Sequence, residues 1–159
     1  MNHLEKLVSQ FYQWRGYLVR NNVKVGALPR GGWEGELDVV AYHPQVGHLI
    51  QIEPSLDAHP WTQREARFRK KFELGRRYIC QDVFPWLAPT TPIEQVAILA
   101  TAGRRQLGGG KVVSVDEFIA TVKDAISKRG PLRKHAIPEE FDLLRTLQLA
   151  LCGYGKLVD

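Results

Sequence analysis

The sequence predicts an α/β fold in which a central mixed β-sheet is flanked by helices. Three observations support this prediction. Apolar residues recur with a helical period from Leu4 to Arg15. Two short β-branched runs joined by a turn, between Gly35 and Ser55, are typical of an antiparallel hairpin. The continuous apolar run from Gln95 to Thr101 is expected of a strand that is covered on both faces.

The first predicted helix extends from Leu4 to Arg15. Its apolar face consists of residues spaced three and four apart, namely Leu4, Leu7, Val8, Phe11 and Trp14. Gly16 follows at a natural C-cap position and ends the helix. We predict a strand from Tyr17 to Val25 and a flexible loop over the glycine-rich segment from Gly26 to Gly35.

The hairpin between Gly35 and Ser55 contains two acids whose positions conflict. If Pro44 to Gly47 is the hairpin loop, the register places Asp38 directly opposite Glu53. Directly opposed side chains lie about 4.5–5.5 Å apart at Cβ, and like charges at that distance destabilise a sheet. The sequence therefore predicts a positively charged group between these two acids.

The elements after the hairpin complete the predicted fold. A second helix begins near Asp57 or His59, with Pro60 in its first turn, and continues to Tyr78. The remaining predicted elements are a surface loop from Cys80 to Pro92, the strand from Gln95 to Thr101, a strand from Lys111 to Val115, a helix capped by Ser114 and Glu117, a basic linker from Lys128 to His135, and a last helix from Pro138 to Leu151.

Composition indicates one globular domain with a polyanionic partner. The chain has 159 residues, of which 44% are hydrophobic and 25% are charged. We expect a core domain over residues 1–128, with a linker and C-terminal helix of residues 129–159 packed on it. The formal net charge is +5, and seven basic residues gather between Arg64 and Arg77, which suits nucleic acid.

The cysteines and the hydropathy of the chain indicate the cellular compartment that we expect. Cys80 and Cys152 lack the spacing of a zinc site. No signal peptide is recognised at the N-terminus, and no apolar run reaches the length of a membrane span. A soluble protein in the reducing cytoplasm, with no membrane partner, is therefore the expectation.

The paired acids suit a hard divalent cation. Mg²⁺ prefers oxygen ligands and keeps several waters, and Mn²⁺ is the alternative ion. Such a cation would offset the repulsion between Asp38 and Glu53. It would also make a bound water more acidic and stabilise charge that develops at phosphorus.

This arrangement resembles the restriction-endonuclease-like, or PD-(D/E)xK, nuclease superfamily. The resemblance covers roughly Leu4 to Ile126 and is based on element order and on the motifs GELDVVA, containing Asp38, and LIQIEPS, containing Glu53. It implies a restriction-endonuclease-like core (αβββαβ) plus a C-terminal helix, and a divalent-metal-dependent endonuclease that hydrolyses DNA phosphodiester bonds. Asp38 and Glu53 then correspond to the metal-binding acids, and Glu5 to an acid on the first helix. Many members act in pairs, so the resemblance allows a homodimer.

The sequence departs from the family pattern at Ser55. The family's lysine belongs at this position, two residues after the second acid, and a neutral hydroxyl cannot supply its charge. In some members the lysine has moved to the following helix. Here Lys71 is a better candidate than Lys70, because it flanks the apolar stripe of that helix instead of facing solvent. Two interpretations stay open: a rearranged active site, and a catalytically inactive nuclease-fold module that binds nucleic acid or a protein partner.

The acids and the serine also have ordinary structural interpretations. Asp38 and Glu53 could lie on the solvated face of a common hairpin. Glu5 could serve only the dipole of the first helix, where an acid in the first turn is stabilising. Ser55 could cap the turn before the second helix.

The basic residues of the second helix have two interpretations. Arg64, Arg67 and Lys71 form a row that could bind DNA phosphates by charge, without reading the base sequence. Alternatively, they could belong to a solvated helix face with salt bridges to Glu65 and Glu73.

Overall fold

A computed structural model describes residues 1–155 and shows an α/β fold built on a six-stranded mixed sheet. The strands are β1 (Leu18–Ala27), β2 (Trp33–His43), β3 (His48–Ser55), β4 (Ile93–Leu99), β5 (Gln106–Leu107) and β6 (Gly110–Ser114). Their order across the sheet is β1-β2-β3-β4-β6-β5. β4 runs parallel to both β3 and β6, and the other neighbours are antiparallel. The predicted mixed sheet is confirmed.

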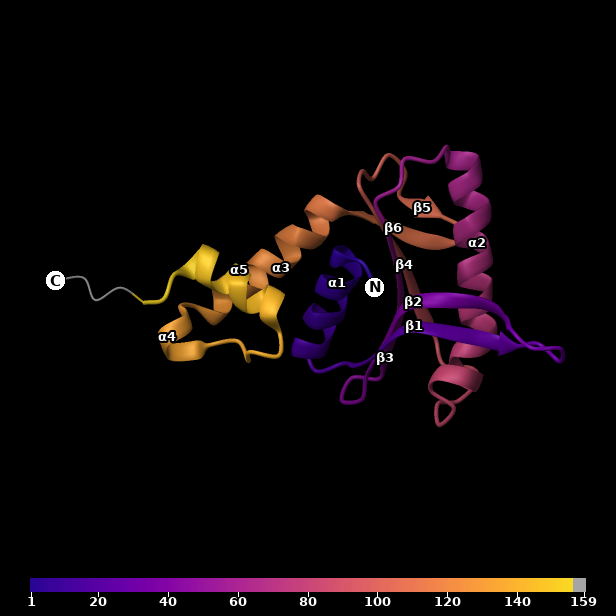
Figure 1. Cartoon of the computed structure of the whole chain (residues 1–159), viewed down its shortest axis with the longest axis horizontal. Coiled ribbons are helices and arrows are strands. Elements are labelled where there is room, and N and C mark those ends of the chain that lie inside the picture. The colour runs from indigo at the N-terminus through magenta and orange to yellow at the C-terminus, as the bar shows by residue number, and fades with distance from the viewer. Residues whose placement is uncertain (156–159) are drawn as a thin grey trace.

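Helices flank this sheet on both faces. They are α1 (His3–Trp14), α2 (Trp61–Tyr78), which continues into the π-helical turn η1 (Ile79–Val83), α3 (Val115–Arg129), α4 (Leu132–His135) and α5 (Asp142–Cys152). In Figure 1, α2 stands on one side of the sheet, and α1, α3 and α5 stand on the other. Val8 and Phe118 pack under α1 and α3, whereas Phe68 and Phe72 fill the core under α2. Within residues 1–155, no helix is long and apolar enough to cross a membrane.

The β1–β2 ribbon is longer than predicted. β1 continues to Ala27 and β2 begins at Trp33, so the predicted loop from Gly26 to Gly35 is mostly strand. Gly31 and Gly32 both have positive φ, and this conformation closes a short turn between the two strands. The glycines therefore mark a tight turn at the end of a ribbon.

Near Asp38, the apolar side chains of β2 switch from packing on one face of the sheet to packing on the other. Val39 packs in the core under α1, but Leu37 packs against Leu74 of α2. Residues two apart on a regular strand share a face, so β2 twists strongly at Asp38. Opposite this point lies Asn22, the one non-glycine residue with positive φ in the described chain. Beyond the twist the ribbon crosses α2, as Figure 1 shows.

The C-terminal segment differs from the prediction in its boundaries. The basic stretch from Lys128 to His135 contains the end of α3 and the short α4, and the last helix begins at Asp142 instead of Pro138. Two backbone amides at the start of α4 donate to carbonyls just after α5, and these bonds order the stretch predicted as a linker.

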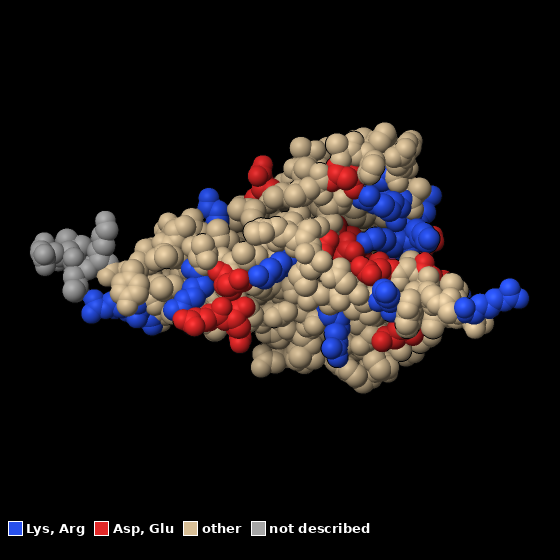
Figure 2. All heavy atoms as spheres, viewed as in Figure 1, with Lys and Arg blue, Asp and Glu red and all other residues tan. Residues whose placement is uncertain are grey.

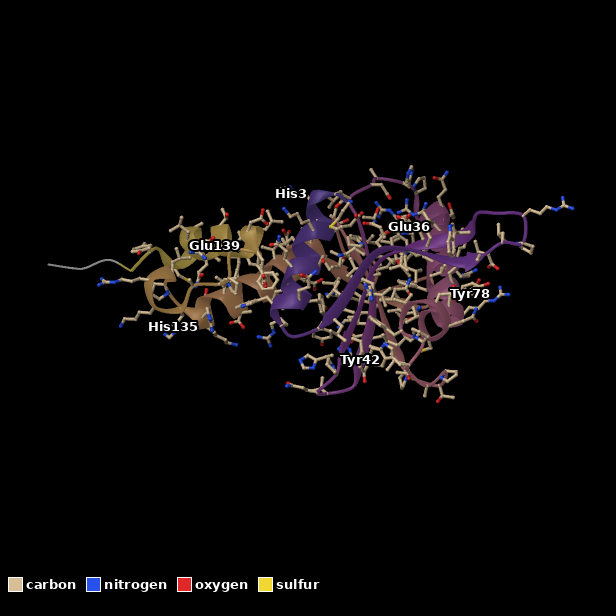
Figure 3. All side chains as sticks on the ribbon, turned by 60° about the horizontal axis from the view of Figure 1, so that its bottom comes forward. His3, Glu36, Tyr42, Tyr78, His135 and Glu139 are labelled. Atoms are coloured by element: carbon tan, nitrogen blue, oxygen red, sulfur yellow. The ribbon has the colours of Figure 1, made fainter. Side chains whose placement is uncertain are left out.

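Helices α4 and α5 lie at the far end of the molecule from the ribbon. Figure 3 places the labelled His135 and Glu139 at this end, and Glu36 and Tyr78 at the other. Leu144 of α5 belongs to the same buried cluster as residues of α1 and α3. Residues 156–159 of the segment lie outside the described part of the chain.

Candidate active site

The two acids of the hairpin lie side by side at one end of the sheet. Val39 pairs with Ile52, and one further step in this register brings Asp38 next to Glu53. The backbone amide of Asp38 donates to Glu53 Oε1 at 3.4 Å. The hairpin register that the turn predicts is therefore the register of the structure.

A lysine from α2 bridges the two acids. Lys71 Nζ donates to Asp38 Oδ1 at 2.6 Å and to Glu53 Oε2 at 2.6 Å. The Lys71, Asp38 and Glu53 side chains are 26%, 15% and 1% exposed, whereas Lys70 faces solvent. A long side chain on the flank of a helix can lay its stem along apolar surface and extend its charge to the sheet. Lys71 thus supplies the positive charge that the facing acids require.

Burial dominates the electrostatics of this cluster. Burial raises the pKa of Glu53 to about 8, although Lys71 opposes the shift, and the charge of Asp38 adds to it. Burial alone would lower the pKa of Lys71, but Glu53 and Asp38 outweigh it and the pKa of the lysine is raised. Lys71 therefore keeps its charge, and burial shifts Glu53 toward its neutral form relative to an exposed glutamate.

Two buried glutamines, which the sequence argument did not single out, lie behind Glu53. Gln51 and Gln95 are direct partners across β3 and β4, and both side chains are buried. Gln51 Nε2 donates to Glu53 Oε1 at 2.8 Å. A glutamine next to apolar residues in each of these two strands was the available signal, because a buried amide needs defined hydrogen-bond partners.

Ser55 belongs to a second polar cluster, on the loop before α2. Its hydroxyl donates to the Asp57 carboxylate and accepts from Arg67 Nη2 at 3.0 Å. Arg67 also donates to the Asp57 carboxylate. Burial acts to raise the pKa of Asp57, but the bonds from Ser55 and Arg67 outweigh it and hold this pKa well below its usual range. These contacts agree with the turn-capping interpretation of Ser55.

The arginines of α2 have different environments. The Arg64 side chain is 10% exposed and donates to the backbone carbonyl of Asp57, so its contacts favour a structural role in holding the loop. The Arg67 side chain is 40% exposed and keeps part of its guanidinium in solvent. Glu65 pairs with Arg69 at 2.8 Å, and not with either of these arginines.

Glu5 lies near the acids, but its carboxylate is engaged at the start of α1. It accepts from the Asn2 backbone amide at 3.1 Å and from Asn2 Nδ2 at 2.6 Å. In return, the Glu5 amide donates to Asn2 Oδ1 at 2.9 Å, which completes a capping box. This geometry favours the helix-end interpretation of Glu5 over a direct role with a cation.

An open pocket of about 370 Å³ gives solvent access to both clusters. Asp38, Glu53 and Lys71 line it together with Asp57 and Arg67. On the face shown in Figure 2, acidic side chains meet Lys and Arg side chains next to α2. A small polyanionic group such as a phosphate can therefore approach the lysine and the acids from one side.

The donor set of the pocket fits a hard divalent cation that keeps most of its waters. Mg²⁺ is commonly bound through one or two carboxylates, and Asp38 and Glu53 provide two beside open solvent. Within residues 1–155, no group of three or more His, Cys, Asp or Glu side chains is placed to hold a metal ion. Lys71 bonds to the same two carboxylates, so a cation and the ammonium compete for them.

Comparisons with known proteins identify no family for this chain. No family model matches the chain, and no curated protein matches it.

Proposed function

We propose that this chain is a divalent-metal-dependent endonuclease-like protein that hydrolyses DNA phosphodiester bonds. The observation that carries the proposal is the position of Lys71 Nζ, 2.6 Å from an oxygen of Asp38 and 2.6 Å from an oxygen of Glu53. Two carboxylates and an ammonium at the wall of an open pocket combine ligands for a cation with a charge that a phosphate can use.

The arrangement of elements supports a relation to the restriction-endonuclease-like superfamily. Apart from the π-helical turn, the chain begins with a helix, three strands, a helix and a strand, in the order of that core. β2 and β3 are antiparallel, and β4 lies parallel to β3. In this proposal Lys71 takes the role of the lysine that is replaced by Ser55.

Asp38 and Glu53 would hold the cation, Mg²⁺ or Mn²⁺. When bound, it would neutralise charge on the phosphate and make a water more acidic. Lys71 stays protonated because its two carboxylate neighbours raise its pKa, so it can donate to a phosphate oxygen or hold the attacking water. Arg67, partly exposed at the same pocket, would contact a phosphate by charge alone.

The second candidate is a nuclease-fold module that binds nucleic acid or a protein partner without cutting it. One observation favours it: the ammonium of Lys71 already bonds to both acids and satisfies them without a cation. The raised pKa of Glu53, about 8, also stabilises its neutral form against cation binding.

Cleavage assays with matched variants separate the two candidates. Purified protein is incubated with Mg²⁺ or Mn²⁺ and single-stranded, duplex or branched DNA. We expect cleavage of at least one substrate, a loss of at least about 100-fold in rate for Asp38→Ala and for Lys71→Met, and no loss for Lys70→Met, the adjacent exposed lysine.

Two outcomes would contradict the proposal. No cleavage of any substrate by the intact protein, with DNA still bound in a gel-shift assay, would favour the binding module. Cleavage that survives Asp38→Ala would show that the reaction takes place elsewhere in the molecule.

A further inference from the structure

The two buried glutamines behind Glu53 form a complete hydrogen-bonded pair. Gln95 Nε2 donates to Gln51 Oε1 at 2.8 Å and to the backbone carbonyl of Phe72 at 2.7 Å. Gln51 Nε2 donates to Glu53 Oε1 at 2.8 Å and to the carbonyl of Lys71 at 3.1 Å. Each side-chain NH₂ group therefore uses both of its protons, as a buried amide must if it is not to destabilise the fold.

The chain of bonds extends to the surface and has a fixed direction. Arg76 Nη1 donates to Gln95 Oε1 at 2.7 Å, and Arg76 is exposed near the end of α2. A guanidinium can only donate, and a backbone carbonyl can only accept, so both amides are oriented from their two ends. Every bond then donates toward Glu53. The last acceptor in the chain is the Glu53 carboxyl group.

Gly75 makes room for this amide pair beneath α2. A Cβ at position 75 would lie 1.8 Å from Gln51 Oε1 and 2.6 Å from Gln51 Cδ, so no larger residue fits while the amide holds its place. A glycine inside a helix costs about 1 kcal/mol relative to alanine. Its presence here has a physical reason, because the helix backbone lies directly on the Gln51 amide.

We infer that Arg76, Gln95 and Gln51 form a relay of positioning residues that holds the Glu53 carboxyl group in the candidate site. This inference rests on the proposed function for its catalytic meaning. Glu53 is 1% exposed, so its carboxyl group depends mainly on protein donors for its hydrogen bonds. Gln51 fixes Oε1 from behind, and Oε2 is left to meet Lys71 and the pocket. Groups behind a metal ligand commonly orient it and tune its affinity in this way.

The relay can be read without metal or activity, from the side-chain amide signals of Gln51 and Gln95 in proton–nitrogen NMR spectra. Gln51→Met and Gln95→Met assign the two NH₂ pairs. We expect both pairs to exchange slowly with solvent and to shift together in Arg76→Met. The matched control is Arg77→Met, which removes the same charge from the next residue, where the guanidinium lies 3.5 Å from Glu34 and outside the relay. Amide signals that do not respond to Arg76→Met would overturn the relay.

The positioning role is measured by calorimetric titration with Mn²⁺. Loss of a group that orients a metal ligand typically weakens affinity about 10–100-fold, so we expect this range for Gln51→Met and a smaller loss for Arg76→Met. Arg76→Lys keeps a donor and is expected to restore most of the affinity. Arg76 is at the surface, so its variants keep the test decisive even if Gln51→Met does not fold.

The outcomes separate the relay from the proposed function. A wild-type protein that binds Mn²⁺ no more tightly than folded Gln51→Met and Arg76→Met would overturn the positioning role and leave the proposed function standing. A wild-type protein that binds no Mn²⁺ would count against the proposed function, and the amide spectra would still decide the relay. In an active enzyme we expect Arg76→Met to lower kcat with KM unchanged, because Arg76 lies behind Glu53 and outside the pocket lining.

Discussion

Two clusters of acidic and basic side chains line the same pocket, and they shift the pKa of their carboxyl groups in opposite directions. In the buried cluster, Glu53 is 1% exposed and its pKa is raised to about 8. In the loop cluster, Asp57 is 24% exposed and its pKa is held well below its usual range. Each acid has a basic partner from α2, Lys71 in one case and Arg67 in the other.

The difference shows that a basic partner does not by itself decide the state of an acid. Burial destabilises the charged form of Glu53 by more than Lys71 and Gln51 stabilise it, and the nearby charge of Asp38 destabilises it further. Burial also opposes the charged form of Asp57, but there the bonds from Ser55 and Arg67 outweigh it. The buried environment therefore favours the neutral form of Glu53, whereas the contacts in the loop cluster favour the charged form of Asp57.

The largest expected effect comes from breaking the buried cluster at Lys71. Lys71→Met would leave two acids facing each other, one of them buried, and removal of one partner from a buried ion pair costs about 3 kcal/mol or more. We expect a loss of this size in the free energy of unfolding at about pH 9.5, above the folded pKa of Glu53, where Lys71 faces two charged acids; urea denaturation measures it. Adding Glu53→Gln should recover most of it, and Lys70→Met is the control. A loss below about 1 kcal/mol, the value for an exposed pair, would mean that the cluster is solvated.

The next effect concerns the pH dependence of the buried cluster, tested with Glu53→Gln. The pKa of Glu53 is about 8 in the folded chain and near the ordinary 4.5 in the unfolded chain. Between these values the folded chain keeps a proton that the unfolded chain has lost, so wild-type stability falls as pH rises through this window. Glutamine does not titrate. We expect the melting temperature of the wild type to fall relative to Glu53→Gln on the order of 10 °C across the window, and to level off above it.

Scanning calorimetry at several pH values between 4.5 and 8 checks this prediction. A difference in melting temperature that rises with pH would mean that the carboxylate is the favoured form. The pKa values of Glu53 and Asp57 would then both be lowered in the folded chain, and the contrast between the two clusters would disappear.

Much of the site was predictable because it follows from local rules. Turn chemistry and strand alternation are short-range, so they fixed the hairpin register that brings Asp38 to Glu53. Helical periodicity placed Lys71 on the flank of α2 that faces the sheet, and distinguished it from Lys70. The helix-end alternative for Glu5 also came from a local rule, the preference for an acid in the first turn, and the capping box with Asn2 agrees with it.

Features that need contacts between distant segments were not predictable in this way. The twist of β2 at Asp38 depends on the packing of Leu37 against α2, on the opposite side of the sheet from α1. From the sequence, Gly75 is only a residue of low helix propensity. The need for glycine there comes from the Gln51 amide, which reaches α2 from β3. The boundaries of α4 and α5 depend on hydrogen bonds between the two ends of the C-terminal segment.

The smallest expected effect is in the loop cluster, where Asp57→Asn keeps the shape and removes the charge. Because Arg67 is 40% exposed, we expect a loss of only about 0.5–1 kcal/mol near neutral pH. The folded pKa of Asp57 is lower than its ordinary 3.8, so the unfolded chain takes up the proton first as pH falls. The advantage of the wild type is therefore fully present at neutral pH and disappears on acidification below that value.

Thermal unfolding of the wild type and Asp57→Asn between about pH 7 and pH 2 measures this loss, because the folded pKa lies well below 3.8 and the advantage is lost only as pH falls toward it. Asp124→Asn is the matched control, since Asp124 pairs with Lys128 at an exposed site on α3 and should change stability by a few tenths of a kcal/mol at most. If the advantage of the wild type persisted at the acid end, the charge of Asp57 would not be what holds the loop. The loop backbone would then hold Ser55 and Arg67 in place, and only the stability of the buried cluster would depend on protonation.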